Sequence, residues 1–193
     1  MTAAEQRIKQ VSARLSALKD EELVRIARLQ LPYVTTAYEV LFNRYYGVLM
    51  QICFRYLGST EEAEEAVNDA MLNVFNRLDQ FEERASFKTW IYKIAFNQSL
   101  DRLRRKQVEQ VEFDEELHRT ATPLLNQPQH NSAQLDALLA KLSIDERSIV
   151  VFRLVGNLEF SEIATIVEQK LSTVKMRYKR ALDKLAVGAQ NQQ

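Results

Sequence analysis

The sequence predicts an all-α protein of two small helical domains joined by a flexible linker. Apolar residues recur at helical spacing along most of the 193 residues, and no stretch alternates apolar with polar residues as a strand does. The chain has only four glycines and three prolines, which leaves little material for the tight turns of β-proteins. We expect an N-terminal helical extension at 1–36, a first domain at 37–106, a linker at 107–131, a second domain at 132–187 and a tail at 188–193.

Helices are predicted throughout the part of the chain before the linker. The first 30 residues form a polar helix and a short second helix, which Asp20 is placed to cap and Pro32 ends. An amphipathic helix covers 37–57 and stops at Gly58. Ser59 begins a capping-box pattern, and the helix that follows carries an apolar stripe on one side and acidic residues on the other.

The next helix, predicted over 87–105 with Ser86 at its start, has two different faces. One face is apolar and docks on the preceding helices. The other is a polar and basic ridge that ends in the run RLRRK, with Tyr92 and Phe96 beside it. Asn97 on this ridge can both donate to and accept from a base edge, and exposed aromatic rings could stack on an unpaired base. The ridge therefore fits a single-stranded nucleic acid, although an aromatic-rich helix also fits a core.

Residues 107–131 lose the apolar periodicity and predict a linker, with at most a short helical piece near 112–117. Beyond it we expect a helix at 135–142. A second capping box, formed by Ser143 and Glu146, precedes another helix, with Gly156 as its C′ residue. Two further helices are expected at 159–168 and 172–186.

The stretch 162–184, EIATIVEQKLSTVKMRYKRALDK, has the arrangement of a helix-turn-helix. Its apolar residues point inward, small Ala164 stands where the helices cross, and the bases of the second helix point outward. Such a helix can enter a major groove. The turn holds Glu168 and no glycine, so we expect a turn residue at positive φ without the residue best suited to it. A helical hairpin with a basic solvent face is the alternative.

Charge is balanced overall and segregated locally. Lys plus Arg and Asp plus Glu number 26 each, so net charge predicts no partner. Residues 60–69 carry five carboxylates and no base, whereas 102–106 carry four bases and 170–184 carry six against one acid. This pattern indicates two contact surfaces of opposite sign, or else ordinary solvated helix faces. The acidic helix would repel nucleic acid and suits a basic protein partner.

The residue inventory argues against an enzyme and predicts no cofactor and no metal. The single cysteine, Cys53, lies in a helical core pattern, and the two histidines, His118 and His130, lie in the linker. No glycine-rich phosphate loop or HExxH motif occurs. There is no signal-peptide pattern and no apolar stretch of about 18 residues, so we expect a cytoplasmic protein without membrane insertion.

The order of these surfaces resembles that of a known family. Residues 38–106, which include SFKTWIYKIAFNQSLD, resemble region 2 of the extracytoplasmic-function (ECF) sigma factors of bacterial RNA polymerase. Residues 135–185, which include EIATIVEQKLSTVKMRYKRALDKL, resemble their region 4. Both phrases look most like the SigX-type branch. The resemblance implies an alternative sigma factor that binds core RNA polymerase and directs promoter recognition, melting and transcription initiation.

The resemblance also implies a role for each surface. The residues expected to contact the polymerase clamp are Glu65, Asn68 and Asp69. The loop 81–86 and the ridge are expected to hold a flipped nontemplate base of the −10 promoter element, through Phe87, Thr89, Lys93, Asn97 and Arg104. The residues expected to read the −35 element are Thr173, Lys175, Met176, Arg177, Lys179 and Arg180. An anti-sigma protein is a further expected partner.

Two other functions stay open at this point. An ordinary regulator could bind an operator as a dimer through its helix-turn-helix, and would need neither the acidic helix nor the ridge. A helical protein-interaction module would have no DNA role. A shallow salt dependence of DNA binding would favour that module, since phosphate contacts impose a steep one.

Overall fold

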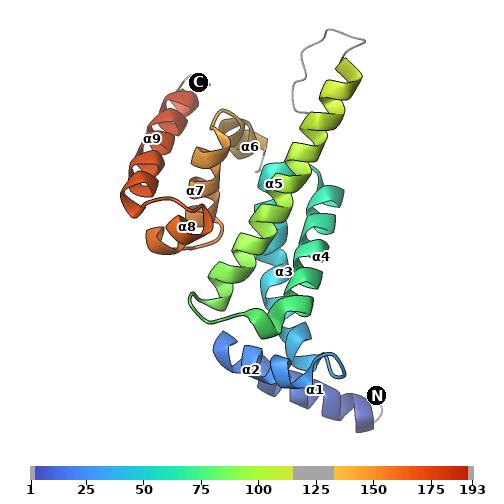
Figure 1. Cartoon of the computed structure of the whole chain (residues 1–193). Helices are drawn as coiled ribbons and strands as arrows, with labels where there is room; N and C mark the ends of the chain where they lie inside the picture. The colour runs from blue at the N-terminus through green and yellow to red at the C-terminus, as the bar shows by residue number, and fades with distance from the viewer. Residues whose placement is uncertain (1–2, 115–132, 191–193) are drawn as a thin grey trace.

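A computed structural model describes residues 3–114 and 133–190, and every regular element in those ranges is helical. The helices form two groups, as the sequence predicts (Figure 1). The first group consists of α1 (Ala3–Ser16), α2 (Asp20–Gln30), α3 (Thr36–Leu57), α4 (Thr60–Arg77), the short 3-10 helix η1 (Leu78–Gln80) and α5 (Phe87–Asp114). The second consists of α6 (Ala133–Ala140), α7 (Ile144–Leu154), α8 (Phe160–Ile166) and α9 (Leu171–Gln190).

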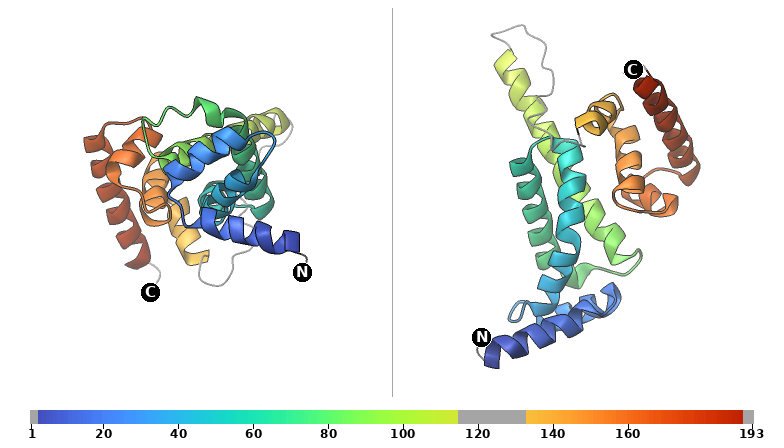
Figure 2. Two further views of the ribbon diagram at one scale, coloured as in Figure 1. Left: turned by 90° about the horizontal axis from the view of Figure 1, so that it is seen from below. Right: turned by 180° about the vertical axis from the view of Figure 1, so that it is seen from behind.

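Helices α3, α4 and α5 form the body of the first domain. The stop at Gly58 is confirmed, because this residue adopts φ 71°, which glycine tolerates best. Ser59 then caps α4, its Oγ accepting the Glu62 backbone N–H at 3.4 Å. Small buried alanines on α4 let the helices approach closely, and α1 and α2 lie across one end of the bundle (Figure 2).

The predicted cap at Asp20 is wrong by one residue. Lys19 occupies the N-cap of α2, and Asp20 is the first helical residue. The Asp20 carboxylate instead accepts hydrogen bonds from the Arg44 guanidinium and the Tyr45 hydroxyl, which ties α2 to α3. A tertiary contact between helices therefore replaces the predicted local cap.

Helix α5 is longer than the 87–105 predicted from periodicity. It continues to Asp114, into the stretch expected to be linker. At the end of the apolar stripe, the Lys106 Nζ pairs with Glu62 Oε1 at 2.5 Å and so ties this part of α5 to α4. The rest of the predicted linker, with both histidines, falls outside the described residues.

The second domain has the predicted helix-turn-helix. The capping box at the start of α7 is confirmed: Ser143 Oγ accepts from the Glu146 N–H, and the Glu146 carboxylate accepts from the Ser143 N–H at 3.1 Å. Ile163 and Val174 are fully buried between the helices. The expectation of positive φ in the turn is also confirmed, since Glu168 has φ 54°.

Gly156 follows the C-cap residue Val155 of α7 and so occupies the predicted C′ position, although its own φ is not positive. The left-handed residue is Asn157, with φ 48°. Glycine is needed at 156 for another reason: a Cβ there would lie 2.8 Å from the Phe152 carbonyl oxygen and 3.1 Å from the Tyr92 ring. This position is where the two domains approach each other closely.

The second domain lies against the first through α7 and α8 (Figures 1 and 2). The buried Phe152 ring of α7 meets two rings of α5, stacking on Tyr92 at 6.5 Å between centroids and meeting Phe96 edge-on at 5.3 Å. Arg55 of α3 forms an ion pair with Asp136 of α6, and both side chains are largely buried. No helix among the described residues is long and apolar enough to cross a bilayer.

Candidate functional site

The acidic face of α4, defined by Glu65, Asn68 and Asp69, is exposed to solvent as predicted. Its two carboxylates are already paired: Arg102 of α5 donates to Glu65 at 2.7 Å and to Asp69 at 2.5 Å. In the sequence Arg102 is recognisable only as part of a basic run, because this contact joins residues far apart in the chain. The ion pairs are open to water, since Glu65 and Asp69 keep 66% and 51% of their side-chain surface exposed. An external cation can therefore still reach them.

The ridge on α5 divides into exposed and buried members. Asn97 and Arg104 are exposed, and Lys93 is partly exposed. Thr89 and Phe87 are each only 2% exposed. The Phe87 ring packs edge-on against Phe81 at 5.8 Å between centroids and so supports the loop 81–86 from below.

The aromatic residues beside the ridge are not free to stack on a base, and that prediction is wrong. Tyr92 and Phe96 are 2% and 7% exposed, because both rings pack against Phe152 of the second domain and also against tyrosine rings of α3. A pattern confined to one helix cannot report that another domain covers it.

Polar groups of the ridge also bond to the second domain. Thr89 Oγ1 donates to Glu162 Oε1 at 3.0 Å, and Lys93 Nζ donates to Glu168 Oε1 at 2.7 Å. The Lys93 ammonium lowers the pKa of the Glu168 carboxyl through this hydrogen bond and its charge. Beside the pair, a groove of about 470 Å³ runs between α5 and the turn of the helix-turn-helix, and Asn97 lines it. These two contacts of Glu162 and Glu168 could not be predicted from the sequence, because they depend on how the domains dock.

The loop 81–86 is held from both sides. Phe81 stacks on Trp90 at 4.9 Å between ring centroids, and the Ser86 Oγ accepts the Thr89 N–H at 3.1 Å, so Ser86 starts α5 as predicted. On the other side, Arg28 of α2 reaches the loop. Its Nε donates to the Leu78 carbonyl at 2.9 Å. This role of Arg28 has no signal in the sequence, because Arg28 lies about fifty positions before the loop.

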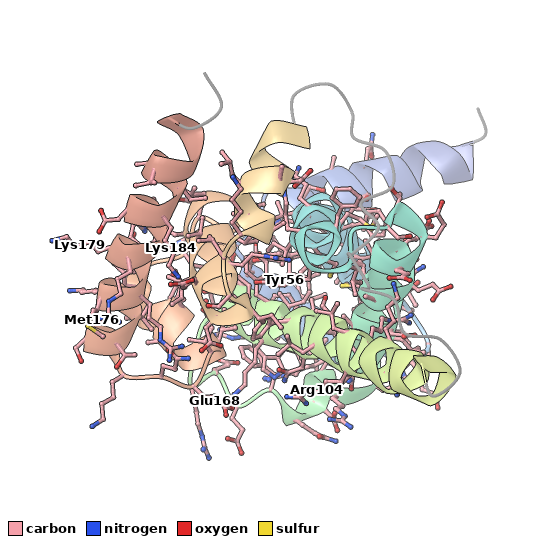
Figure 3. All side chains as sticks on the ribbon, turned by 90° about the horizontal axis from the view of Figure 1, so that it is seen from above. Tyr56, Arg104, Glu168, Met176, Lys179 and Lys184 are labelled. Atoms are coloured by element: carbon pink, nitrogen blue, oxygen red, sulfur yellow. The ribbon has the colours of Figure 1, made fainter. Side chains whose placement is uncertain are left out.

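The basic face of α9 points away from the first domain. Figure 3 shows Met176 and Lys179 on the outer side of α9, whereas Glu168 lies at the seam next to α5. The exposed members of this face are Lys175, Met176, Lys179 and Arg180, and the partly buried ones are Thr173 and Arg177. Arg177 forms an ion pair with Asp145 of α7. In the described ranges no three His, Cys, Asp or Glu side chains come together as a metal site would require.

Both domains match models of one family. Residues 41–109 match Sigma-70 region 2, and residues 132–185 match Sigma-70 region 4. The chain is 28% identical over 163 residues to the ECF RNA polymerase sigma factor SigW of Bacillus subtilis, covering 77% of this chain and 87% of SigW. It is 28% identical over 149 residues to the sigma factor YlaC (74% and 86%) and 26% identical over 154 residues to SigX (75% and 82%), both of the same organism.

Two solved structures share the fold. The structure of CnrH in complex with the cytosolic domain of CnrY superposes with a TM-score of 0.69 at 20% identity, covering 90% of this chain and 99% of that one. The sigma factor RpoE of Bartonella quintana, solved with the anti-sigma factor NepR, superposes with a TM-score of 0.64 at 19% identity (79% and 95%). Both of these matches extend over the two helical domains.

Proposed function

Because the chain belongs to the ECF group of the sigma-70 family, we propose that its three surfaces divide the work of an alternative sigma factor. The acidic face of α4 binds core RNA polymerase, the ridge of α5 with the loop 81–86 captures the −10 element, and the basic face of α9 reads the −35 element. The distribution of charge is the observation that supports this division, because the chain presents an acidic face, a polar ridge and a basic recognition helix on separate elements.

The acidic face suits a basic helix of the polymerase. Glu65 and Asp69 lie one turn apart on α4 with Asn68 between them, so the three side chains form one compact target. Arg102 already pairs with both carboxylates, so a cationic side chain of the polymerase has to bind them alongside Arg102 or displace it. Complementary charge of this kind gives fast and specific association more than raw affinity.

Two exposed ridge residues are the best candidates for direct contact with the −10 strand. Asn97 has the donor and acceptor that a base edge requires, and Arg104 has a charge for the backbone. Thr89 and Phe87 are buried, so in our proposal Phe87 supports the loop while Thr89 and Lys93 become available when the second domain moves away. Capture of an unstacked base offsets a cost of a few kcal/mol.

The basic face of α9 fits the −35 duplex. Its N-terminal residues Thr173, Lys175 and Met176 stand where a recognition helix meets base edges, and Lys179 and Arg180 follow for phosphates. Arg177 is held by Asp145, so it enters the interface only after giving up that pair.

Promoter-directed transcription is favoured over the two other functions left open by the sequence. An operator-binding dimer has no use for the acidic face or the loop 81–86, and an interaction module has no use for the basic face. The branch within the family stays a prediction, because SigW and YlaC are as similar to this chain as SigX is. We also propose the order of extension, two domains, linker and tail predicted above, with the last helix of the first domain continuing to Asp114, together with a cytoplasmic location beside the polymerase and no enzymatic activity of the chain itself.

An anti-sigma protein is part of the proposal. RpoE of Bartonella quintana, whose fold this chain shares, was solved with the anti-sigma factor NepR. A protein inserted between or around the two domains would cover the surfaces that the polymerase and promoter need.

The test of the polymerase contact is a binding titration with bacterial core RNA polymerase. A Glu65→Gln/Asp69→Asn variant should bind core at least severalfold more weakly, with a shallower salt dependence than the wild type. Glu64→Gln, an exposed change on the same helix, is the matched control and should bind like the wild type. Equal binding by all three proteins would remove the acidic face from the proposal.

A further inference from the structure

We infer that Arg28, in the N-terminal extension ahead of the family match, is a positioning residue for the loop 81–86. The inference rests on the proposed function, in which this loop holds a flipped base. All three nitrogens of the Arg28 guanidinium donate along one short stretch of chain: Nε to the Leu78 carbonyl at 2.9 Å, one Nη to the Phe81 carbonyl, and the other Nη to Glu83 Oε1 at 3.2 Å.

These contacts need an arginine. The planar fork of a guanidinium presents several donors in fixed directions, whereas a lysine ammonium is a single point charge. The carbonyl of Leu78 lies where α4 gives way to η1 and also accepts the Phe81 N–H at 3.3 Å, so the Arg28 Nε adds a second donor at the start of η1. The guanidinium also stands 5.6 Å from the centroid of the Phe81 ring, which adds a cation–π contact to the hydrogen bonds.

The loop has a backbone conformation that requires such support. Glu83 adopts φ 58°, a left-handed value that is unfavourable for a residue with a side chain and persists only where the surroundings hold it. The aromatic cluster of Phe81, Phe87 and Trp90 fixes the loop from the α5 side. Arg28 fixes it from the α2 side, so the N-terminal extension helps to shape the surface that meets the −10 strand.

The test compares Arg28→Lys with Arg25→Lys, an exposed arginine one turn earlier on the same helix. The probe is a promoter fragment on which the wild-type holoenzyme initiates, and melting is read by permanganate reactivity of its thymines. In Arg28→Lys the hydrogen bonds from the charged guanidinium fork are lost. Promoter melting by this variant should therefore be about tenfold lower than by the wild type. Binding to core polymerase should stay unchanged, and Arg25→Lys should match the wild type in both measurements.

Wild-type melting by Arg28→Lys would overturn the inference. So would a parallel fall in melting, core binding and thermal stability, because that result indicates a role in folding alone. If the wild-type protein supports no melting on any fragment, the proposed function has failed; if the wild type melts the promoter and Arg28→Lys melts it equally well, only the inference about Arg28 has failed.

A second inference is carried by the domain interface: the second domain occludes the −10 ridge in the free protein. The Glu162 carboxylate accepts a hydrogen bond from Thr89, and the Glu168 carboxylate accepts one from Lys93. Thr89 and Lys93 are proposed to contact DNA, so the two carboxylates occupy positions that the negatively charged DNA would take. The basic face of α9 points outward and stays open (Figure 3). The free protein should therefore bind duplex DNA but bind single-stranded DNA poorly.

This occlusion requires an opening step, and the Arg55–Asp136 pair offers a way to promote it without changing charge on the ridge. The pair joins α3 to α6, whereas Glu162 and Glu168 belong to α8 and the turn after it. Removing the carboxylate leaves the largely buried Arg55 without this partner and weakens the docking of the second domain. Asp136→Asn is thus an opening variant, and Glu168→Gln is a variant of the ridge contact itself.

The probes are labelled pools of short random-sequence DNA, single-stranded and duplex. Loss of the exposed Lys93–Glu168 pair should raise single-strand affinity about twofold to fivefold and leave duplex affinity unchanged. Glu159→Gln makes the same charge change within the second domain, where Glu159 pairs with Arg153, and should change neither. Asp136→Asn should also bind single strands more tightly and show a larger radius of gyration by X-ray scattering.

Equal single-strand affinity for the wild type, Glu168→Gln and Asp136→Asn would overturn the occlusion. A rise in duplex affinity of the same size would do so too, because it would reflect net charge alone. Neither result bears on the proposed function, which is tested separately by whether the holoenzyme initiates at a promoter.

Discussion

The close packing around Gly156 allows the effect of a Gly156→Ala substitution on stability to be predicted from interatomic distances. In Gly156→Ala the new Cβ would lie 2.8 Å from the Phe152 carbonyl oxygen and 3.1 Å from the Tyr92 ring. The carbonyl accepts the Leu158 N–H at 3.1 Å, so it moves only by straining that bond. The Tyr92 ring is 2% exposed and stacked on Phe152. Overpacking of this kind costs about 1–3 kcal/mol.

Gly47 provides a matched control of opposite sign. It lies in the middle of α3, and a Cβ there would meet nothing within 4 Å. Alanine is favoured over glycine in a helix interior, so Gly47→Ala should stabilise the protein by about 0.5–1 kcal/mol.

The assay for both variants is urea denaturation followed by far-UV circular dichroism, with midpoints compared at unchanged slope. Trp90 fluorescence follows the first domain separately if the domains unfold in two steps. Gly156→Ala should lower the midpoint, and Gly47→Ala should raise it. A Gly156→Ala midpoint equal to or above that of the wild type would refute the reasoning about the interface.

Three further predictions concern single side chains. Ser143→Ala removes the N-cap of α7 and should lower the free energy of unfolding by about 1 kcal/mol, measured by denaturation; no loss would mean that the cap is unimportant. The hydrogen bond from Lys184, with others from Ser143, lowers the pKa of the Glu146 carboxyl, so its stabilising contribution is complete above the ordinary glutamate pKa and is lost as pH falls through the lowered value. Glu146→Gln should flatten that acidic part of the stability profile, and an unchanged profile would contradict the assignment. Burial raises the pKa of the Cys53 thiol to about 11, so a thiol reagent should react slowly with the native protein and rapidly once it is unfolded; rapid labelling of the native state would be the contrary result.

Local features of the fold could be predicted from the sequence because their causes are local. Gly58 stops α3, Ser59 and Ser143 cap the helices that follow, and Glu168 carries the positive φ of the turn. Each depends on neighbours within about one helical turn. The acidic face of α4 was predictable for the same reason, since helical periodicity separates Glu65 and Asp69 from the buried alanines of α4.

The features that could not be predicted depend on contacts between distant segments. Asp20 bonds to α3 rather than capping α2, and Arg102 pairs with α4. Tyr92 was expected on the surface because its helix face looked polar, but Phe152 covers it. Gly156 is required by a close contact with the Tyr92 ring of the other domain, which the sequence around it does not show. Periodicity gives the faces of a helix, and only the docking of the domains decides what covers each face.

The central claim is that this chain directs promoter recognition by RNA polymerase, and reconstituted transcription tests it most directly. Active bacterial core polymerase is incubated with a library of promoter fragments, with and without the protein, and the 5′ ends of the transcripts are mapped. We predict initiation at defined positions on a subset of fragments only when the protein is present. If active core polymerase from a close relative of the source neither binds the protein nor initiates with it, the claim is contradicted.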